Sequence, residues 1–339
     1  MTTTTGNAAP ERLQHNFRLG LLFAVGSALA FGSSGPFAKA LMEAGWSPLA
    51  AVTARLAGGA AAMAAFACLA RPGWAREAIR HHRTVLVYGL VPIAGAQLFY
   101  YSAVAHLSVG VALLLEYTAP VLVVAWLWAT TRRRPSTMTF AGGALAIIGV
   151  MFVLNVFSGA HINLVGVSWA SGAAVCAAFY FMMSGRAGTD DTDLSPISLA
   201  AGGLIVGATA VGLLGVAGIM PMTFTTGAVV IAGFSTSWVV PVVALGLIPT
   251  ALAYTLGIVG IAHLKPRFAS LVGLSEVLFA VLSAWLLVGE AITPMQAFGG
   301  AVVLVGLALA RQGDRSEQAS WPDLAGCDLP DGVPDLAND

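Results

Sequence analysis

The sequence predicts an all-α membrane protein whose ten transmembrane helices form two inverted-topology five-helix repeats. Composition, an internal repeat and the distribution of basic residues together lead to this fold class. Of the 339 residues, 58% are hydrophobic and only 9% are charged, and the mean hydropathy is +0.83. Soluble domains carry about 25% charged residues. The composition is therefore that of a chain that crosses a membrane many times.

The internal repeat has an offset of 157 residues, the difference between positions 263 and 106. At this offset Ala105-His106-Leu107 aligns with Ala262-His263-Leu264, and Gly89-Leu90-Val91-Pro92 aligns with Gly246-Leu247-Ile248-Pro249. Chance does not keep one register over such a distance. A repeat with an odd number of helices places its second copy upside down in the membrane, which is the architecture of alternating-access transporters.

Ten apolar segments are long enough to span a bilayer. Their expected bounds are 19–41, 47–70, 84–105, 109–130, 138–157, 164–184, 196–217, 239–262, 268–288 and 294–311. They make up a first repeat (19–157) and a second repeat (164–311), between an N-terminal segment (1–18) and a disordered acidic tail (312–339). Three spans begin with a hydroxyl cap followed by proline at the first helical position, at Ser47-Pro48, Ser195-Pro196 and Thr293-Pro294. The sequence leaves the structure of residues 218–238 open, and their apolar residues are compatible with a partial or interfacial helix.

The basic residues predict the orientation in the membrane. With the N-terminus inside, fourteen of the sixteen Lys and Arg residues fall in inner segments. The exceptions are Lys39, at the outer end of the first span, and Arg55, inside the second. Because positive charge collects on the cytoplasmic side, both termini are expected to be cytoplasmic. The inner set is Arg12, Arg18, Arg71, Arg76, Arg80, Arg83, Arg132, Arg133, Arg134, Arg186, Lys265, Arg267, Arg311 and Arg315.

Several function classes are excluded at this point. The formal net charge is zero, so nothing points to a nucleic-acid partner. Three scattered cysteines are too few for a disulfide framework or a metal site, and no cofactor is expected. The chain has no His-Glu-x-x-His, no G-x-S-x-G and no phosphate-binding glycine loop. An intramembrane enzyme would need such a constellation, so the protein is not expected to be an enzyme.

Two carboxylates inside apolar spans are the leading functional candidates. Glu116 lies within the fourth span and Glu276 within the ninth. At the repeat offset Glu276 aligns with Ala119, nearly one helical turn from Glu116, so both occupy the same face of repeat-related helices. An intramembrane charge costs roughly 2.5–3.5 kcal/mol on insertion scales and usually faces a bundle interior. We expect the pair to bind a cationic group or exchange a proton; the alternative is neutral, hydrogen-bonded helix glue.

A polar wall is expected beside these carboxylates. Gln97, Tyr100 and Tyr101 occupy one face of the third span, and Thr250 and Tyr254 occupy one face of its repeat mate. Ordinary hydrogen bonding between helices is the alternative to a pocket. The same wall is expected to include the neighbours of the two carboxylates, Tyr117, Thr118 and Ser275.

Arg55 is the third charged candidate. Its position inside the second span suits it to bind a substrate carboxylate or to neutralise Glu116, although it can also extend its guanidinium to the outer surface. His106 and His263 end spans near opposite membrane faces and are interpreted as boundary residues. Gly289-Glu290 is interpreted as the end of the ninth span.

Four motifs carry a family resemblance: Phe99-Tyr100-Tyr101-Ser102, Glu116-Tyr117-Thr118-Ala119-Pro120, Ser184-Gly185-Arg186-Ala187-Gly188 and Gly289-Glu290-Ala291-Ile292-Thr293-Pro294-Met295-Gln296. Together with the repeat, they resemble the EamA-type members of the drug/metabolite transporter superfamily. The bacterial threonine/homoserine exporter branch is the most similar. The resemblance covers residues 19–311. The sequence departs from the pattern at Val277, where the pattern has proline after the glutamate, and at Arg132-Arg133-Arg134, where the first repeat lacks Gly-Glu.

The resemblance implies a multi-pass protein of the bacterial inner membrane that exports small amino acids in exchange for protons. It also implies that Glu116, Glu276 and Arg55 match polar residues of the family pattern. The partners are then a small-molecule solute, protons and the lipid bilayer. The alternatives are a transporter of another solute, such as a purine, a cationic drug or another metabolite, and a structural or receptor-like membrane protein. The last would not need two repeat-related intramembrane carboxylates.

Overall fold

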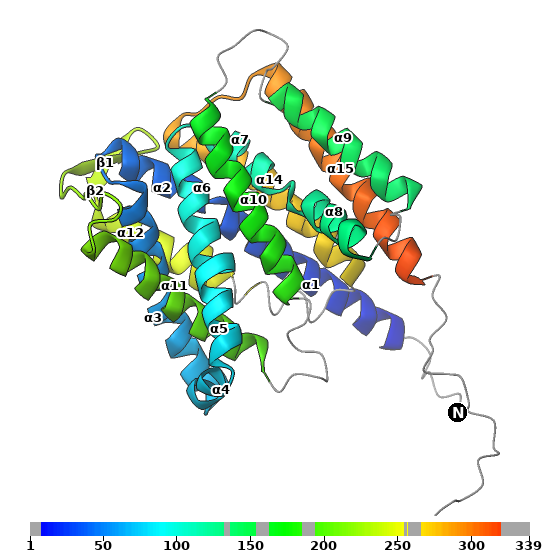
Figure 1. The fold of residues 1–339 in the computed structure, drawn as a ribbon, viewed down its shortest axis with the longest axis horizontal. Coiled ribbons are helices and arrows are strands. Elements are labelled where there is room, and N and C mark those ends of the chain that lie inside the picture. The colour runs from blue at the N-terminus through cyan, green and yellow to red at the C-terminus, as the bar shows by residue number, and fades with distance from the viewer. Residues whose placement is uncertain are drawn as a thin grey trace, which may run out of the picture.

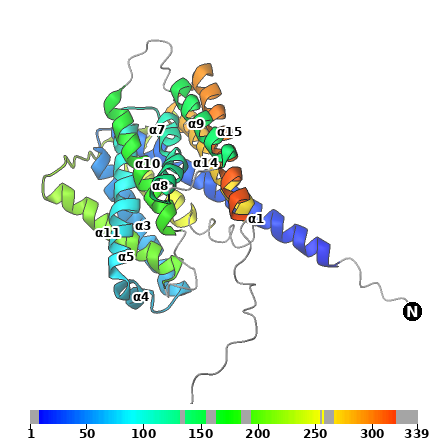
Figure 2. The ribbon, with the colours of Figure 1, turned by 45° about the vertical axis from the view of Figure 1, so that its right-hand side comes forward.

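The computed structural model describes residues 8–131, 136–153, 163–184, 194–253, 256 and 266–319, and most of them lie in helices packed into one bundle (Figures 1 and 2). The first half contains α1 (Ala8–Gly32), α2 (Ser34–Glu43), α3 (Pro48–Ala70), α4 (Trp74–Arg80), α5 (His82–Tyr88), the π-helix η1 (Gly89–Gly95), α6 (Ala96–Val104), α7 (Val109–Glu116), α8 (Ala119–Thr131) and α9 (Thr137–Val153). The second half contains α10 (Leu164–Ser184), α11 (Pro196–Val216), β1 (Ala228–Ile231), β2 (Phe234–Ser237), α12 (Val239–Gly246), the π-helix η3 (Leu247–Leu252), α14 (Pro266–Val288) and α15 (Pro294–Ala319).

The predicted spans are helical wherever the structure describes them. Five helical stretches are long and apolar enough to cross a membrane, at Leu19–Glu43, Pro48–Ala70, His82–Val104, Val109–Thr130 and Ile197–Val216. Five shorter apolar helices match the other spans, at Thr137–Val153, Leu164–Tyr180, Val239–Leu252, Ser275–Val288 and Pro294–Ala310. The predominance of apolar helices agrees with the predicted class.

The predicted helix caps are confirmed. The Ser47 hydroxyl accepts the Ala50 N–H at 3.2 Å, and the Ser195 hydroxyl accepts the Ser198 N–H at 3.2 Å. Thr293 and Gln296 exchange side-chain to backbone bonds of 3.2 and 3.0 Å, which is a capping box. Gly289 ends α14 with a positive φ of 75°, and the N–H of Glu290 then bonds the Ala284 carbonyl.

Four interruptions of the helices have a common cause. Proline has no N–H for the carbonyl four residues earlier and clashes with it. Pro36 cannot donate a helical hydrogen bond to the Gly32 carbonyl, and α1 ends at Gly32. In the same way Pro120 cannot donate to the Glu116 carbonyl, and α7 ends at Glu116. Pro92 and Pro249 lie at repeat-related positions inside the π-helices η1 and η3. The first and fourth predicted spans are therefore present, and each contains a break between two helices.

The two halves of the chain interleave. Extensive contacts join α9 with α15, α3 with α11, α1 with α14 and α6 with α10, and each pairs one helix from either half. Figure 1 shows α9 and α15 side by side along one side of the bundle. They touch through glycines: a Cβ at Gly142 would lie 2.4 Å from the Ala310 nitrogen, and one at Gly299 would lie 2.7 Å from the Val153 nitrogen. These contacts run in opposite directions along the two helices.

Residues 228–237, within a stretch whose structure the sequence left open, form a β-hairpin and not a partial helix. The register pairs Ala228 with Ser237 and Ile231 with Phe234. Ala232 and Gly233 both have positive φ, as the twist of a tight hairpin turn requires. The Ala232 N–H donates to the Leu287 carbonyl at 2.8 Å, so the turn satisfies a carbonyl left open at the end of α14.

The helical region extends past the expected spans at both ends. α1 begins at Ala8, within the predicted N-terminal segment, and α15 continues to Ala319, within the predicted tail. Both extensions are rich in strong helix formers such as Ala, Glu, Gln and Arg. The polar composition that set the ends of the expected spans does not report this helix propensity.

Candidate functional site

Arg55 is the centre of a buried polar cluster. It lies in the N-terminal half of α3 and is only 6% exposed. Its Nη1 donates to the Ser34 hydroxyl at 2.5 Å, to the Gln97 Oε1 at 2.5 Å and to the Tyr101 hydroxyl at 3.2 Å. The Ser34 and Tyr101 hydroxyls are themselves 2.9 Å apart. Three helical segments, α2, α3 and α6, therefore meet at one guanidinium.

The two predicted carboxylates lie next to this cluster. Glu276, on α14, accepts a 2.6 Å hydrogen bond from the hydroxyl of Tyr117. Glu116 interacts electrostatically with Glu276 and with Arg55, and Tyr100 interacts with all three. Both carboxylate side chains are half-buried, in contrast to the buried Arg55. One arginine and two acids thus share a polar centre inside an apolar bundle.

Helix interruptions position several of these groups. Ser34 is the first residue of α2, Glu116 is the last residue of α7, and Gln97 follows η1 directly. Backbone groups freed from a helix ladder inside a membrane protein are tolerated where they are buried in protein or line a cavity. Discontinuous helices that meet near the midplane are a recurring feature of transporter binding sites.

Glycines allow the helices to approach each other around the centre. A Cβ at Gly32 would lie 2.9 Å from the Glu276 carbonyl oxygen, which places the end of α1 against the backbone of α14. A Cβ at Gly35 would lie 2.5 Å from the Tyr100 hydroxyl. Larger residues at these two positions would push apart the helices that carry the charged groups.

The remaining predicted residues lie as follows. Thr250 is buried in η3, where its hydroxyl donates to the Leu245 carbonyl at 3.2 Å, the carbonyl that Pro249 leaves open. Ser275 is half-buried beside Glu276, and the hydroxyl of Thr118 donates to the Leu115 carbonyl at 2.7 Å. Tyr254 and His263 lie outside the described residues. The roles predicted for all of these residues stay predictions.

Ser34 was not foreseen as a site residue. It is 4% exposed and is one of the three acceptors that hold Arg55. The signal was present in Pro36, which opens the helix at this point, but a serine in a Gly-Ser-Ser-Gly run is more typical of a turn or of small-residue packing.

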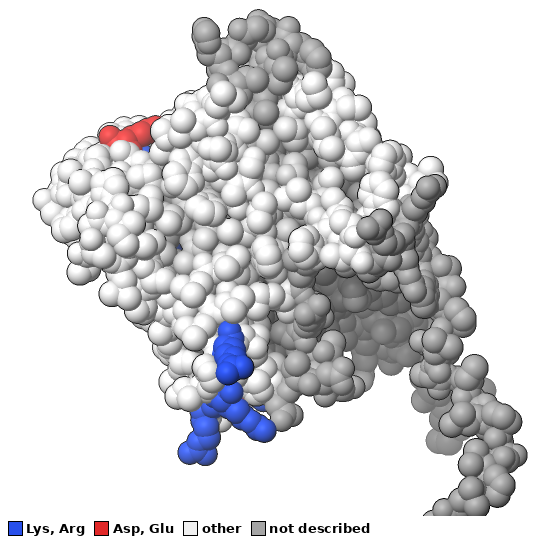
Figure 3. Space-filling view, in the orientation of Figure 1, with Lys and Arg blue, Asp and Glu red and all other residues white. Residues whose placement is uncertain are grey.

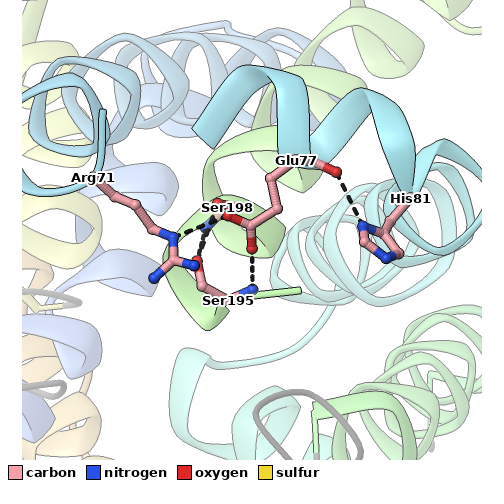
Figure 4. Close-up of polar contacts among 5 residues, drawn as sticks. All are labelled: Arg71, Glu77, His81, Ser195 and Ser198. Carbon is pink, nitrogen blue, oxygen red and sulfur yellow. Dashed lines mark hydrogen bonds and ion pairs between the residues drawn. The ribbon is translucent and has the colours of Figure 1, made fainter. Parts of the chain in front are cut away.

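The two halves are linked at both ends of α3. At its C-terminal end, near α4, the Glu77 carboxylate accepts from Arg71 Nε at 2.9 Å and from the Ser195 N–H (Figure 4). Burial raises the pKa of Glu77, but hydrogen bonds from Ser195, Arg71 and Ser198 outweigh this effect and hold the pKa below its usual value. The basic side chains visible in Figure 3 gather at this α4 end.

At its N-terminal end, near the hairpin, Ser47 bonds the backbone of Thr223 in both directions, at 2.9 and 3.1 Å. At this hairpin end Lys39 of α2 also forms an ion pair with Glu290, whose carboxylate accepts the Val109 N–H at 3.0 Å. The Glu77–Ser195 and Ser47–Thr223 linkages correspond to each other under the repeat. In each of them, the start of the second predicted span of one half bonds the segment that precedes the third predicted span of the other half.

Fold and site together define a helical membrane protein with a charged centre between two interleaved halves. A model of the EamA-like transporter family matches residues 18–155 and again residues 164–312. The chain belongs to the EamA-like transporter family, as its motifs predicted, and this family is one of transporters rather than enzymes.

Named relatives point in the same direction. The chain is 29% identical over 235 residues to the threonine/homoserine exporter RhtA of Escherichia coli (strain K12), covering 68% of this chain and 72% of that protein. It is 30% identical over 230 residues to the threonine/homoserine exporter RhtA of Salmonella typhimurium (strain SL1344), covering 67% and 70%. A crystal structure aligns with a TM-score of 0.57 at 23% identity over 88% of this chain and 98% of the other, which supports the fold.

Proposed function

We propose that this protein is a secondary transporter that exports small amino acids resembling threonine or homoserine by alternating access, in exchange for protons. The observation that carries the proposal is the polar centre, where Arg55, Glu116 and Glu276 interact between helices of both halves. The similarity to two threonine/homoserine exporters supports the choice of solute.

The charges of the centre suit a zwitterion. A guanidinium binds a carboxylate with directed hydrogen bonds, so Arg55 would take the α-carboxylate of the solute. Glu276, oriented by the Tyr117 hydroxyl, and Glu116 would take the ammonium group. Gln97, Tyr100 and Tyr101 would line the path beside them, and the hydroxyl of the solute would find partners among these polar side chains.

Competition at the carboxylates would couple the solute to protons. A carboxylate that binds an ammonium group must be ionised, and protonation removes that attraction. Proton and solute therefore weaken each other's binding by the same factor, as thermodynamic linkage requires. If the two alternate at Glu116 and Glu276, inward proton movement drives outward solute movement, which is antiport.

The architecture proposed for this cycle is ten transmembrane helices in two inverted five-helix repeats, in the bacterial inner membrane with both termini in the cytoplasm. The opposite course of α9 and α15 supports the inversion, since these two helices are repeat mates. The contacts of α6 with α10 and of η3 with α1 are also counterparts under the repeat. Arg71, Arg76, Arg80 and Arg83 would then mark the inner face.

The test is efflux from proteoliposomes loaded with labelled threonine or homoserine, with and without an imposed proton gradient. We expect the gradient to accelerate efflux at least tenfold in the wild type and to have no effect on Glu116→Gln. Glu43→Gln is the matched control, because Glu43 lies exposed at the end of α2, away from the centre.

Efflux that responds equally to the gradient in Glu116→Gln and in the wild type would remove Glu116 from the coupling step. If neither amino acid moves through folded wild-type protein, the proposed solute is wrong. The paired carboxylates then favour a cationic solute, and a panel of amines, including cationic drugs, is the next measurement.

A further inference from the structure

The link between Lys39, Glu290 and Val109 joins three separate elements at the hairpin end of the bundle. Lys39 belongs to α2, Val109 opens α7, and Glu290 lies between α14 and α15. The Lys39 and Glu290 side chains are only 21% and 16% exposed, so the ion pair is largely enclosed. Glu290 contacts both of its partners with different oxygens, Oε1 for Lys39 and Oε2 for the Val109 N–H.

Glu290 stabilises the start of α7. A carboxylate at a helix N-terminus satisfies a backbone N–H that has no partner within the helix, and it complements the helix dipole. The Ser108 hydroxyl accepts the Val111 N–H at 3.4 Å on the same turn. α7 is only eight residues long and ends at Glu116, so Glu290 holds one end of a short helix whose other end carries the proposed coupling residue.

The same carboxylate also restrains α2. This helix begins at Ser34, which accepts a hydrogen bond from Arg55, and its Lys39 pairs with Glu290. The proline breaks separate α2 from α1 and α7 from α8. Both helices thus run as short units from the charged centre to the hairpin end, where one carboxylate ties them together.

We propose that Glu290 is the gating residue at the outer end of the transporter. Its bonds to Lys39 and to the Val109 N–H hold α2 and α7 closed over the charged centre, and release of solute to the outside requires these bonds to break. The inference rests on the proposed function for the direction of transport and for the placing of the hairpin end outside. Gly289 precedes Glu290 and has a positive φ, a conformation that glycine adopts at little cost. The space where a side chain would lie is also open, so Gly289 can serve as a backbone hinge for Glu290.

Reversible cross-linking tests the gate. Lys39→Cys and Glu290→Cys are combined in a full-length protein whose native Cys68, Cys176 and Cys327 are alanine, and the pair is joined with a short, cleavable bis-maleimide. We expect the cross-link to lower threonine or homoserine efflux at least tenfold and its reductive cleavage to restore the rate. The same reagent on the cysteine-free protein should leave efflux unchanged. Unchanged efflux in the cross-linked protein overturns the gate.

Hydrogen exchange of the α7 amides gives a readout that needs no solute. Glu290→Ala removes both bonds, whereas Glu290→Gln keeps an acceptor for the Val109 N–H and loses only the charge pair. In nanodiscs we expect exchange at residues 109–112 to rise at least tenfold in Glu290→Ala and much less in Glu290→Gln. Equal exchange in the wild type and Glu290→Ala shows that Glu290 does not hold α7. Absence of efflux in the cysteine-free protein, which keeps Lys39 and Glu290, would instead refute the proposed solute, so the two failures are distinguishable.

Discussion

At the scale of single residues, Arg55 presents the sharpest energetic problem. A buried charge is costly unless hydrogen bonds and opposite charges replace its hydration. Here the hydroxyls of Ser34 and Tyr101 and the amide oxygen of Gln97 accept from one guanidinium nitrogen, and the Tyr101 ring lies 5.8 Å from the Arg55 Cζ. These oxygens orient the guanidinium, and its charge also interacts with the carboxylates of Glu116 and Glu276.

Replacing Arg55 with lysine tests this role. A lysine keeps the charge but cannot reproduce the planar donor array. Hydrogen bonds to charged groups contribute about 1.5–3 kcal/mol each, and about 1.4 kcal/mol is a tenfold change in affinity. We therefore expect the KM for efflux to rise tenfold or more in Arg55→Lys, measured over a range of internal solute concentrations. Arg76→Lys on the exposed face of α4 is the control, and an unchanged KM in Arg55→Lys would contradict a carboxylate-binding role.

Glu77 predicts a pH-dependent contribution to stability. Its pKa in the folded protein lies below the reference value of 4.5, so the folded state favours the ionised form. The stabilisation is complete above pH 4.5 and disappears as the pH falls through the lowered pKa. Thermal unfolding of wild type and Glu77→Gln should therefore differ at pH 7 and converge as the pH falls below the lowered pKa. Glu43→Gln should match the wild type throughout, and a wild-type to Glu77→Gln difference that is constant with pH would contradict the assignment.

At the scale of elements, prolines convert predicted continuous spans into shorter units around the centre. The break at Tyr117 and Thr118 separates α7 from α8. The π-helices η1 and η3 interrupt the α-helical hydrogen bonding at repeat-related positions of the two halves. α14, in contrast, continues unbroken through Glu276, where Val277 follows instead of proline. Glu116 therefore ends a short helix that is separate from α8, whereas Glu276 belongs to a long continuous helix.

Pro120→Ala should close the break after α7. Alanine supplies the missing N–H to the Glu116 carbonyl, and a hydrogen bond contributes about 0.5–1.5 kcal/mol. We expect thermal stability to be kept or increased while efflux falls at least tenfold, because a continuous helix fixes Glu116 in one position. Pro48→Ala is the control, since proline at the start of α3 disrupts no ladder bond. Slower amide exchange at residues 117–121 with unchanged efflux would show that the break is not needed for transport.

At the scale of the whole molecule, local signals were predictable and long-range ones were not. Hydropathy located the helices, and hydroxyl-proline pairs located the starts of α3, α11 and α15. Both signals could be read from the sequence because they depend only on residues that are neighbours in the chain. The placing of Glu116 and Glu276 on corresponding helix faces, which the repeat offset predicts, stays a prediction. The partners of Ser34 and the pairing of Lys39 with Glu290 depend on how distant segments pack. Pro120 signalled the break after Glu116, but the uniform apolarity of 109–130 favoured one long span. The strands of the 228–237 hairpin have only four residues each, and Ala-Val-Val-Ile lacks the apolar-polar alternation that would have predicted a strand.

The proposed orientation leads to the last prediction, because an inverted second half and a parallel second half place different segments outside. In a background without the three native cysteines, Glu43→Cys reports on the loop after the first span, and Arg76→Cys reports on the loop after the second. A membrane-impermeant thiol reagent added to intact cells should label position 43 at once and position 76 only after lysis. Gly227→Cys, in the loop before β1, should behave like position 43, because inversion places the seventh loop outside. Labelling of position 227 only after lysis would mean that the second half runs parallel to the first, and a site formed between inverted repeats would then be impossible.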